Sequence, residues 1–151
     1  LNWWEAQERL AGWREALLAA GLFADEALVA EGDWLADSGR LAMETLLARN
    51  PGLDAVFASN DTMALGALHT AHACGLAVPA DLLLAGFDNT PEAAVYWPPL
   101  TSVRQGLRQM GCLAVETLHA IIEEQAGAPP QIQLQPELVV RRSSQKTAAA
   151  A

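Results

Sequence analysis

The stretch "VFASNDTMALGALHTAHACG", residues 56–75, joins the end of an apolar strand to a helix through a polar junction. The strand, predicted over 54–59, is apolar at nearly every position, which is typical of a parallel strand covered on two faces. The helix is predicted over 61–74. Two short polar side chains, Asn60 and Asp61, stand where one helix cap would be enough. We expect Asp61 to be the cap, because it directly precedes the helix, and Asn60 to be free for another role.

The rest of the chain continues this alternation. Helical spacing of Leu10, Trp13, Leu17 and Leu18 predicts a first helix over 3–20. The other predicted elements are a strand over about 27–31, a helix capped by Asp37 or Ser38 and running to about 49, strands over 82–87 and 101–103, a helix over about 106–125, and strand-like pieces over 131–135 and 137–141. Such an order implies an α/β fold with a doubly wound parallel sheet. Since this kind of sheet normally opens with a strand, we expect one upstream of residue 1.

The last part of the chain carries two further expectations. In the helix over 106–125, Leu113, Leu118, Ile121 and Ile122 form an apolar stripe that we expect to belong to a core. The segment over 143–151 has no apolar period, and we expect it to be frayed.

Composition and charge argue against several classes of protein. The 151 residues suffice for one domain with a sizeable core. The net charge is −9 and Lys and Arg together number nine, so we expect no direct DNA contact from this segment. No apolar run approaches the ~20 residues of a membrane helix. The two cysteines give no disulfide framework.

Three polar turns are predicted to meet at one edge of the sheet. They are "EGDW" (31–34), "SND" (59–61) and "FDN" (87–89), and ligands of open parallel sheets bind at the carboxyl ends of the strands. Trp34 offers a flat apolar face, while Asn60 and Asp88 can each make two hydrogen bonds, as paired sugar hydroxyls require. Each residue alone is more often structural, as a cap, turn residue or core anchor. Their coincidence favours a sugar or polyol site.

These stretches resemble the effector-binding core of the lactose-repressor (LacI/GalR) family of bacterial transcription regulators. The resemblance covers nearly the whole chain and rests on "ERLAGW" (8–13), "EGDW" (31–34), "AVFASNDTMALGAL" (55–68), "GLAVPADLLLAGFDNT" (75–90), "WPPLTSVRQ" (97–105) and "ELVVRRSS" (137–144). Six motifs in order and at compatible spacing make it specific.

The resemblance implies a periplasmic-binding-protein-like fold of two subdomains around a cleft. Residues 1–103 would form the C-terminal effector subdomain, without its first strand. Residues 104–135 would belong to the N-terminal subdomain, 136–142 would return as a strand to the C-terminal one, and 143–151 would be a tail. The DNA-binding domain would precede residue 1, and the cleft would be only half present.

The resemblance also implies roles for single residues. Arg9 would bind sugar hydroxyls, Trp34 would pack against the ligand, Asn60 and Asp88 would grip ring hydroxyls, and Gln105 would lie at a further cleft position. Dimerisation would involve Leu65 and Tyr96. Asn89 stands where the family often has a second Asp, which affects ligand preference.

The function implied is that of a cytoplasmic, dimeric repressor core that senses a sugar, galactoside-like in class, and thereby changes DNA affinity. No cofactor is implied. A periplasmic sugar-binding protein of a transporter is the alternative, and a purine is the alternative ligand. An enzyme is not expected, although Asp61 and Asp88 share an edge, because no G-x-S-x-G, H-E-x-x-H or phosphate loop occurs. For His69, His72 and Cys74 a solvated or partner-facing helix surface is favoured over a metal site.

Overall fold

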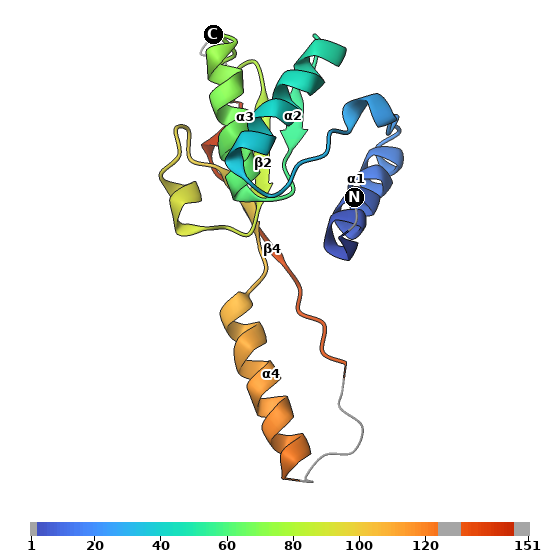
Figure 1. The fold of residues 1–151 in the computed structure, drawn as a ribbon, viewed down its shortest axis with the longest axis vertical. Coiled ribbons are helices and arrows are strands. Elements are labelled where there is room, and N and C mark those ends of the chain that lie inside the picture. Colours follow the sequence, from blue (N-terminus) through green and yellow to red (C-terminus); the bar gives the residue numbers. More distant parts are fainter. Residues whose placement is uncertain (1–2, 124–130, 147–151) are drawn as a thin grey trace.

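The computed structural model describes residues 3–123 and 131–146, in which helices and strands alternate (Figure 1). Its elements, with η for 3₁₀ helices, are α1 (Trp4–Ala19), η1 (Glu26–Leu28), α2 (Ala36–Arg49), β1 (Ala55–Phe57), α3 (Asp61–Ala73), β2 (Leu83–Phe87), η2 (Pro91–Ala94), β3 (Thr101–Arg104), α4 (Leu107–Ile122), β4 (Glu137–Val139) and η3 (Arg142–Ser144). In the described part of the chain, no helix has the length and apolar character needed to cross a bilayer.

The four strands form one sheet in the order β1-β2-β3-β4. The first three run parallel, with Val56 opposite Leu84 and Gly86 opposite Ser102, whereas β4 runs antiparallel to β3. The α/β fold expected from the alternation is thus confirmed. One correction is that the sheet ends in an antiparallel edge strand, because the chain returns alongside β3 after α4.

Helices α2 and α3 pack together, and α3 covers one face of the sheet (Figure 1). The core between them contains Met43, Ala64, Leu68, Leu82, Leu84 and Leu100, all at most 4% exposed. Two glycines bring the helix backbones into contact. A methyl group on Gly66 would overlap the carbonyl oxygen of Ala36, and one on Gly39 would overlap that of Met63.

The opposite side of the sheet is more open than predicted. In β1, Ala55 and Phe57 are exposed, so the expectation of a strand covered on both faces was wrong. A hollow of about 970 Å³ separates β1 from the apolar side of α1, which includes Leu10 and Trp13. Leu18, predicted to share that side, is 64% exposed.

The strand predicted over 27–31 is not formed. The N–H groups of Leu28 and Val29 instead bond to the carbonyl oxygens of Asp25 and Glu26, which closes η1. Without a neighbouring strand to take up its backbone groups, this segment satisfies them locally. It lies across the hollow from β1.

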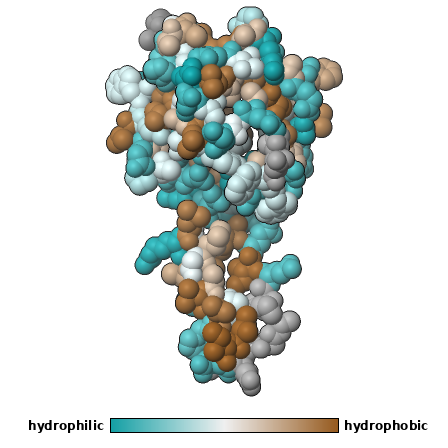
Figure 2. Space-filling model, in the orientation of Figure 1, coloured by the Kyte–Doolittle hydropathy of each residue, from teal (hydrophilic) through white to brown (hydrophobic). Residues whose placement is uncertain are grey.

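An arm made of α4 and residues 131–136 projects from the rest of the molecule, connected to it by β3 and β4 (Figure 1). Hydrophobic side chains gather on this arm (Figure 2), and Leu118 and Ile122 are 58% and 68% exposed. The expectation of a core stripe in α4 was wrong for the described residues, because none of their elements covers it. The strand over 131–135 is also absent there, since no strand lies beside it. The helix end predicted near 125 falls outside the described residues.

Two smaller predictions are corrected. Neither Asp37 nor Ser38 caps α2: the N-cap is Leu35, Asp37 pairs with Arg40, and the Ser38 hydroxyl donates to the Leu35 carbonyl. The tail is not frayed at its start, because Ser143 is fully buried and its hydroxyl donates to the Leu84 carbonyl at 2.6 Å. Residues 147–151 lie outside the described residues.

The close helix contact leads to a stability prediction. Replacing Gly66 with Ala should lower the free energy of unfolding by about 1–3 kcal/mol, because the added methyl must push α2 and α3 apart. Gly12→Ala in α1 is the matched control: nothing lies within 4 Å of its added methyl, so helix propensity should raise stability by up to about 1 kcal/mol. Urea unfolding measures both changes, and a Gly66→Ala protein as stable as the parent would contradict the packing.

Candidate functional site

The polar junction before α3 works in the opposite way from the prediction. Asn60 is the N-cap: its backbone is extended, and its Oδ1 accepts the Met63 N–H at 2.7 Å. Asp61 is the first helical residue, so its side chain cannot take the cap position. The Asn60 amide also donates to the Trp34 carbonyl at 2.9 Å. Asn60 therefore joins two of the three turns, and at 9% exposure most of its bonding is internal.

Asp61 is fully buried and organises the third turn. Its Oδ1 accepts the Ser102 hydroxyl at 2.6 Å, and its Oδ2 accepts the Thr90 N–H at 2.7 Å. The Tyr96 hydroxyl donates to the Asp61 backbone carbonyl at 3.3 Å. One buried carboxylate thus fastens the start of α3 to β3 and to the turn that follows β2.

That turn holds an unusual backbone. Asp88 and Asn89 have φ values of 104° and 54°, in the left-handed region that residues other than Gly rarely adopt. Ser102 Oγ accepts the Asn89 N–H at 2.9 Å, and the Asn89 side-chain oxygen accepts from Arg141 at 2.7 Å. Arg141 also donates to the Leu100 carbonyl. Such conformations persist only where the surrounding structure holds them in place. The hydrogen bonds from Asn89 to Ser102 and from Arg141 to Asn89 therefore fix the shape of this turn.

The Asp88 carboxylate points toward the start of the arm. It accepts the Gln105 amide N–H at 2.8 Å. Burial raises the pKa of the Asp88 carboxyl above its usual value, and the opposing effects of Arg9 and of the Gln105 hydrogen bond only partly cancel this. A half-buried acceptor with a raised pKa in a preformed turn is typical of a functional position.

Arg9 connects the first helix to all three turns. Its guanidinium donates to the Ser59 carbonyl at 2.8 Å and lies over the Phe87 ring, 4.0 Å from the centroid. The Trp34 centroid is 5.5 Å from the same guanidinium. Phe87 was not predicted as a site residue, although it is the first letter of the "FDN" turn. Its pairing with a helix 78 positions earlier leaves no local signal.

Trp34 is half-buried and has a φ of 73°. Its ring meets that of Trp3 edge-on, with centroids 6.5 Å apart and planes at 86°. Arg9 contacts Trp34, and Gln105 donates to Asp88. The two pairs are near enough for the charge of Arg9 to lower the pKa of the Asp88 carboxyl against the effect of burial. Asn60 lies beside them but acts mainly as cap and brace.

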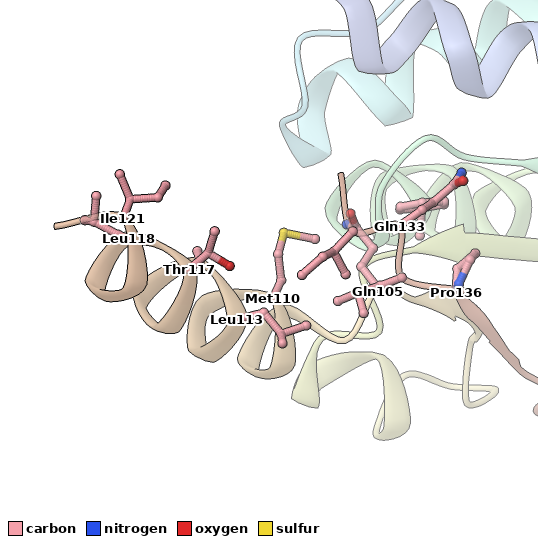
Figure 3. A pocket seen from close by; sticks show the side chains of 12 residues that line it. Gln105, Met110, Leu113, Thr117, Leu118, Ile121, Gln133 and Pro136 are labelled. Atoms are coloured by element: carbon pink, nitrogen blue, oxygen red, sulfur yellow. The ribbon is translucent and has the colours of Figure 1, made fainter. Parts of the chain in front are cut away.

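Beyond Gln105 the site continues into a second hollow of about 580 Å³. Figure 3 shows Gln105 at one end of this hollow and the side chains of α4, including Met110 and Leu113, along it. This part is largely apolar and belongs to the projecting arm.

The two residues proposed for dimerisation differ in position. Leu65 is 41% exposed on the outer side of α3, whereas Tyr96 is half-buried and bonded to Asp61. His69, His72 and Cys74 are exposed near the end of α3. Within residues 3–123 and 131–146, no group of three or more potential metal ligands occurs.

Comparison with known proteins places this geometry in a family. Residues 2–144 match the periplasmic binding protein-like domain. The HTH-type transcriptional regulator CelR of Thermobifida fusca is 45% identical over 136 residues, 90% of this chain and 40% of its own length. The HTH-type transcriptional repressor PurR of Vibrio campbellii is 39% identical over 140 residues, 93% of this chain and 42% of its own.

Solved structures of transcriptional regulators have the same fold as this chain. A transcriptional regulator CelR–cellobiose complex superposes with a TM-score of 0.87 at 44% identity, covering 91% of this chain and 42% of that one. The Lac repressor bound to ONPG in the repressed state gives 0.83 at 34% identity, covering 93% and 42%. The chain thus spans about two fifths of the length of these relatives.

Removing the buried carboxylate of Asp61 tests whether it holds the start of α3 to β3 and to the turn after β2. Asp61→Ala should lower the free energy of unfolding by about 3 kcal/mol or more, because it leaves the Ser102 hydroxyl and the Thr90 N–H without their acceptor. Asp37→Ala removes an exposed acid paired with Arg40 and should change stability by at most about 1 kcal/mol. Equal effects of the two changes in urea unfolding would contradict the structural role of Asp61.

The raised pKa of Asp88 leads to a pH-dependent prediction. Since its pKa is raised on folding, ionising Asp88 costs stability, and this loss sets in as the pH rises through the folded pKa. Asp88→Asn keeps the acceptor oxygen and tolerates positive φ. It should therefore stabilise the protein at pH 7, with the gain disappearing below about pH 4. Unfolding curves at pH 7 and below about pH 4 measure this difference. The prediction is contradicted if the Asp88→Asn protein is less stable than the parent at pH 7.

Proposed function

Because this chain belongs to the LacI family of transcriptional regulators, within its periplasmic-binding-protein-like domain, we propose that it is the sugar-sensing core of a repressor. The observation that carries the proposal is two contacting pairs, Arg9 with Trp34 and Asp88 with Gln105, with the charge of Arg9 acting on the Asp88 carboxyl. An indole face beside a guanidinium, a carboxylate and an amide suits the apolar C–H side and the hydroxyls of a pyranose. The relatives named above are transcriptional regulators rather than enzymes.

The ligand proposed is a β-linked glucose disaccharide such as cellobiose. The sequence alone favoured a galactoside-like sugar, but the relative solved with cellobiose is 44% identical, against 34% for the one solved with ONPG. A purine, the alternative ligand from the sequence analysis, is the competing proposal. Asp88 and Gln105 favour hydroxyls, because a carboxylate offers acceptor lone pairs while a side-chain amide offers both N–H donors and an acceptor oxygen.

Sensing would depend on where Gln105 lies. It directly follows β3 and precedes α4, at the crossing where the chain leaves the sheet for the arm. We assign residues 104–135 to a second subdomain that closes the cleft in the whole protein, with 136–142 returning to the first. A sugar touching both Asp88 and Gln105 would then favour one relative orientation of the subdomains. Coupling energies of this kind are typically about 1–3 kcal/mol.

Two partners follow from the same proposal. A second copy would associate through the face of α3 that carries Leu65, with Tyr96 supporting the adjoining turn. DNA would be bound by a part of the protein outside this chain, since the net charge here is −9. This arrangement corresponds to a cytoplasmic regulator rather than a transport protein.

The proposal is tested on the whole protein by calorimetric titration with cellobiose. Asp88→Ala should weaken binding by at least about tenfold, because hydrogen bonds to a charged group contribute about 1.5–3 kcal/mol. Glu44→Ala, on the exposed side of α2 and paired with Arg40, is the control and should bind like the parent. Operator affinity should change on addition of the sugar. No response to any sugar, or a response only to purine bases, would overturn the proposed ligand class.

A further inference from the structure

A second indole adjoins the proposed sugar site. Trp3 precedes the first residue of α1 and is 63% exposed. Its ring stands at 86° to that of Trp34, with 6.5 Å between centroids. In the described part of the chain, Trp3 is not among the buried core residues, and Ala6, at 6% exposure, is the one buried residue of α1. An aromatic side chain of this size, held against another and left open, is suited to a ligand.

Resting on the proposed function, we infer that Trp3 and Trp34 form a second sugar subsite, so that the protein recognises disaccharides in preference to monosaccharides. The two rings make a corner rather than a stack, and a corner presents two apolar faces at right angles. One sugar ring can pack on Trp34 while the next ring of the same molecule meets Trp3.

The arrangement of polar groups gives this subsite a direction. Asp88 and Gln105 are bonded to each other at one end. Arg9 lies over the ring of Phe87, the residue that precedes Asp88, and its guanidinium is 5.5 Å from the Trp34 centroid. Hydrogen-bonding groups are therefore concentrated at the first position, where a sugar ring would lie between Trp34 and Asp88. Apolar surface dominates the second position, at Trp3. A monosaccharide would use the first position alone, whereas a disaccharide would use both.

The neighbouring residue provides a matched control. Trp4 is 69% exposed, similar to Trp3, but makes no ring contact in the described part of the chain. Replacing either residue removes one exposed indole at the start of α1. Only the loss of Trp3 dismantles the corner with Trp34.

The experiment compares cellobiose with methyl β-glucoside in calorimetric titrations of the whole protein. The parent should bind cellobiose at least tenfold more tightly. Trp3→Ala should remove most of this preference, by weakening cellobiose binding at least about tenfold while leaving the binding of methyl β-glucoside within about twofold. Trp3→Phe, which keeps an aromatic face, should restore part of the preference, and Trp4→Ala should behave like the parent.

The outcomes separate this inference from the proposed function. If the parent binds both sugars equally, or if Trp3→Ala weakens both to the same extent with an unchanged unfolding midpoint, the second subsite is overturned while sugar sensing stands. If the parent binds neither sugar, the proposed ligand cellobiose is wrong and the inference fails with it. Equal losses in the Trp3→Ala and Trp4→Ala proteins would also overturn a specific role for Trp3.

Discussion

The buried carboxylate of Asp61 is the interaction on which the geometry of the site depends. It accepts from Ser102 in β3 and from Thr90 after β2, while its own backbone starts α3. A charge removed from water is tolerated only when its oxygens are bonded, and here both are. Because Ser102 accepts in turn from Asn89, this buried network holds the turn of Asp88 and Asn89, where φ is positive. Asp88, the proposed sugar-binding carboxylate, directly precedes Asn89 of this network, and its own side chain accepts from Gln105.

The site combines a rigid half with an open half. On the rigid side, hydrogen bonds of Asn60 and Asp61 join the start of α3 to the turn of Trp34 and to the turn after β2 that contains Asp88. On the open side, Gln105 leads into an arm whose apolar surface is exposed within the described chain. Under the proposed function, ligand-driven closure would require that the ligand contact these fixed groups and the second subdomain differently in the two orientations.

Much of the fold could be predicted because apolar runs and polar turns are local signals. The helices over 61–74 and 3–20, and the strands over 82–87 and 101–103, were located to within one or two residues. The failures depend on long-range partners. The segment over 27–31 lacks a neighbouring strand, and the stripe of α4 lacks a covering element among the described residues. The roles of Asn60 and Asp61 were exchanged, because a one-residue shift in helix start decides which side chain is the cap. Trp34, Asn60 and Asp88 were predicted from polar turns, and Arg9 and Gln105 from the family resemblance. The contacts of Phe87 with Arg9 and of Trp3 with Trp34 are seen only in the tertiary structure.

The glycine contact between α2 and α3 has a consequence for how such a receptor can diversify. The turn of Trp34 leads into α2 and that of Asn60 into α3, and these helices touch backbone to backbone at Gly39 and Gly66. Main-chain atoms therefore set the spacing between the two turns, independently of the side chains that the turns carry. Selection, or a protein engineer, can exchange the residues that meet a ligand while the frame that spaces them keeps its dimensions.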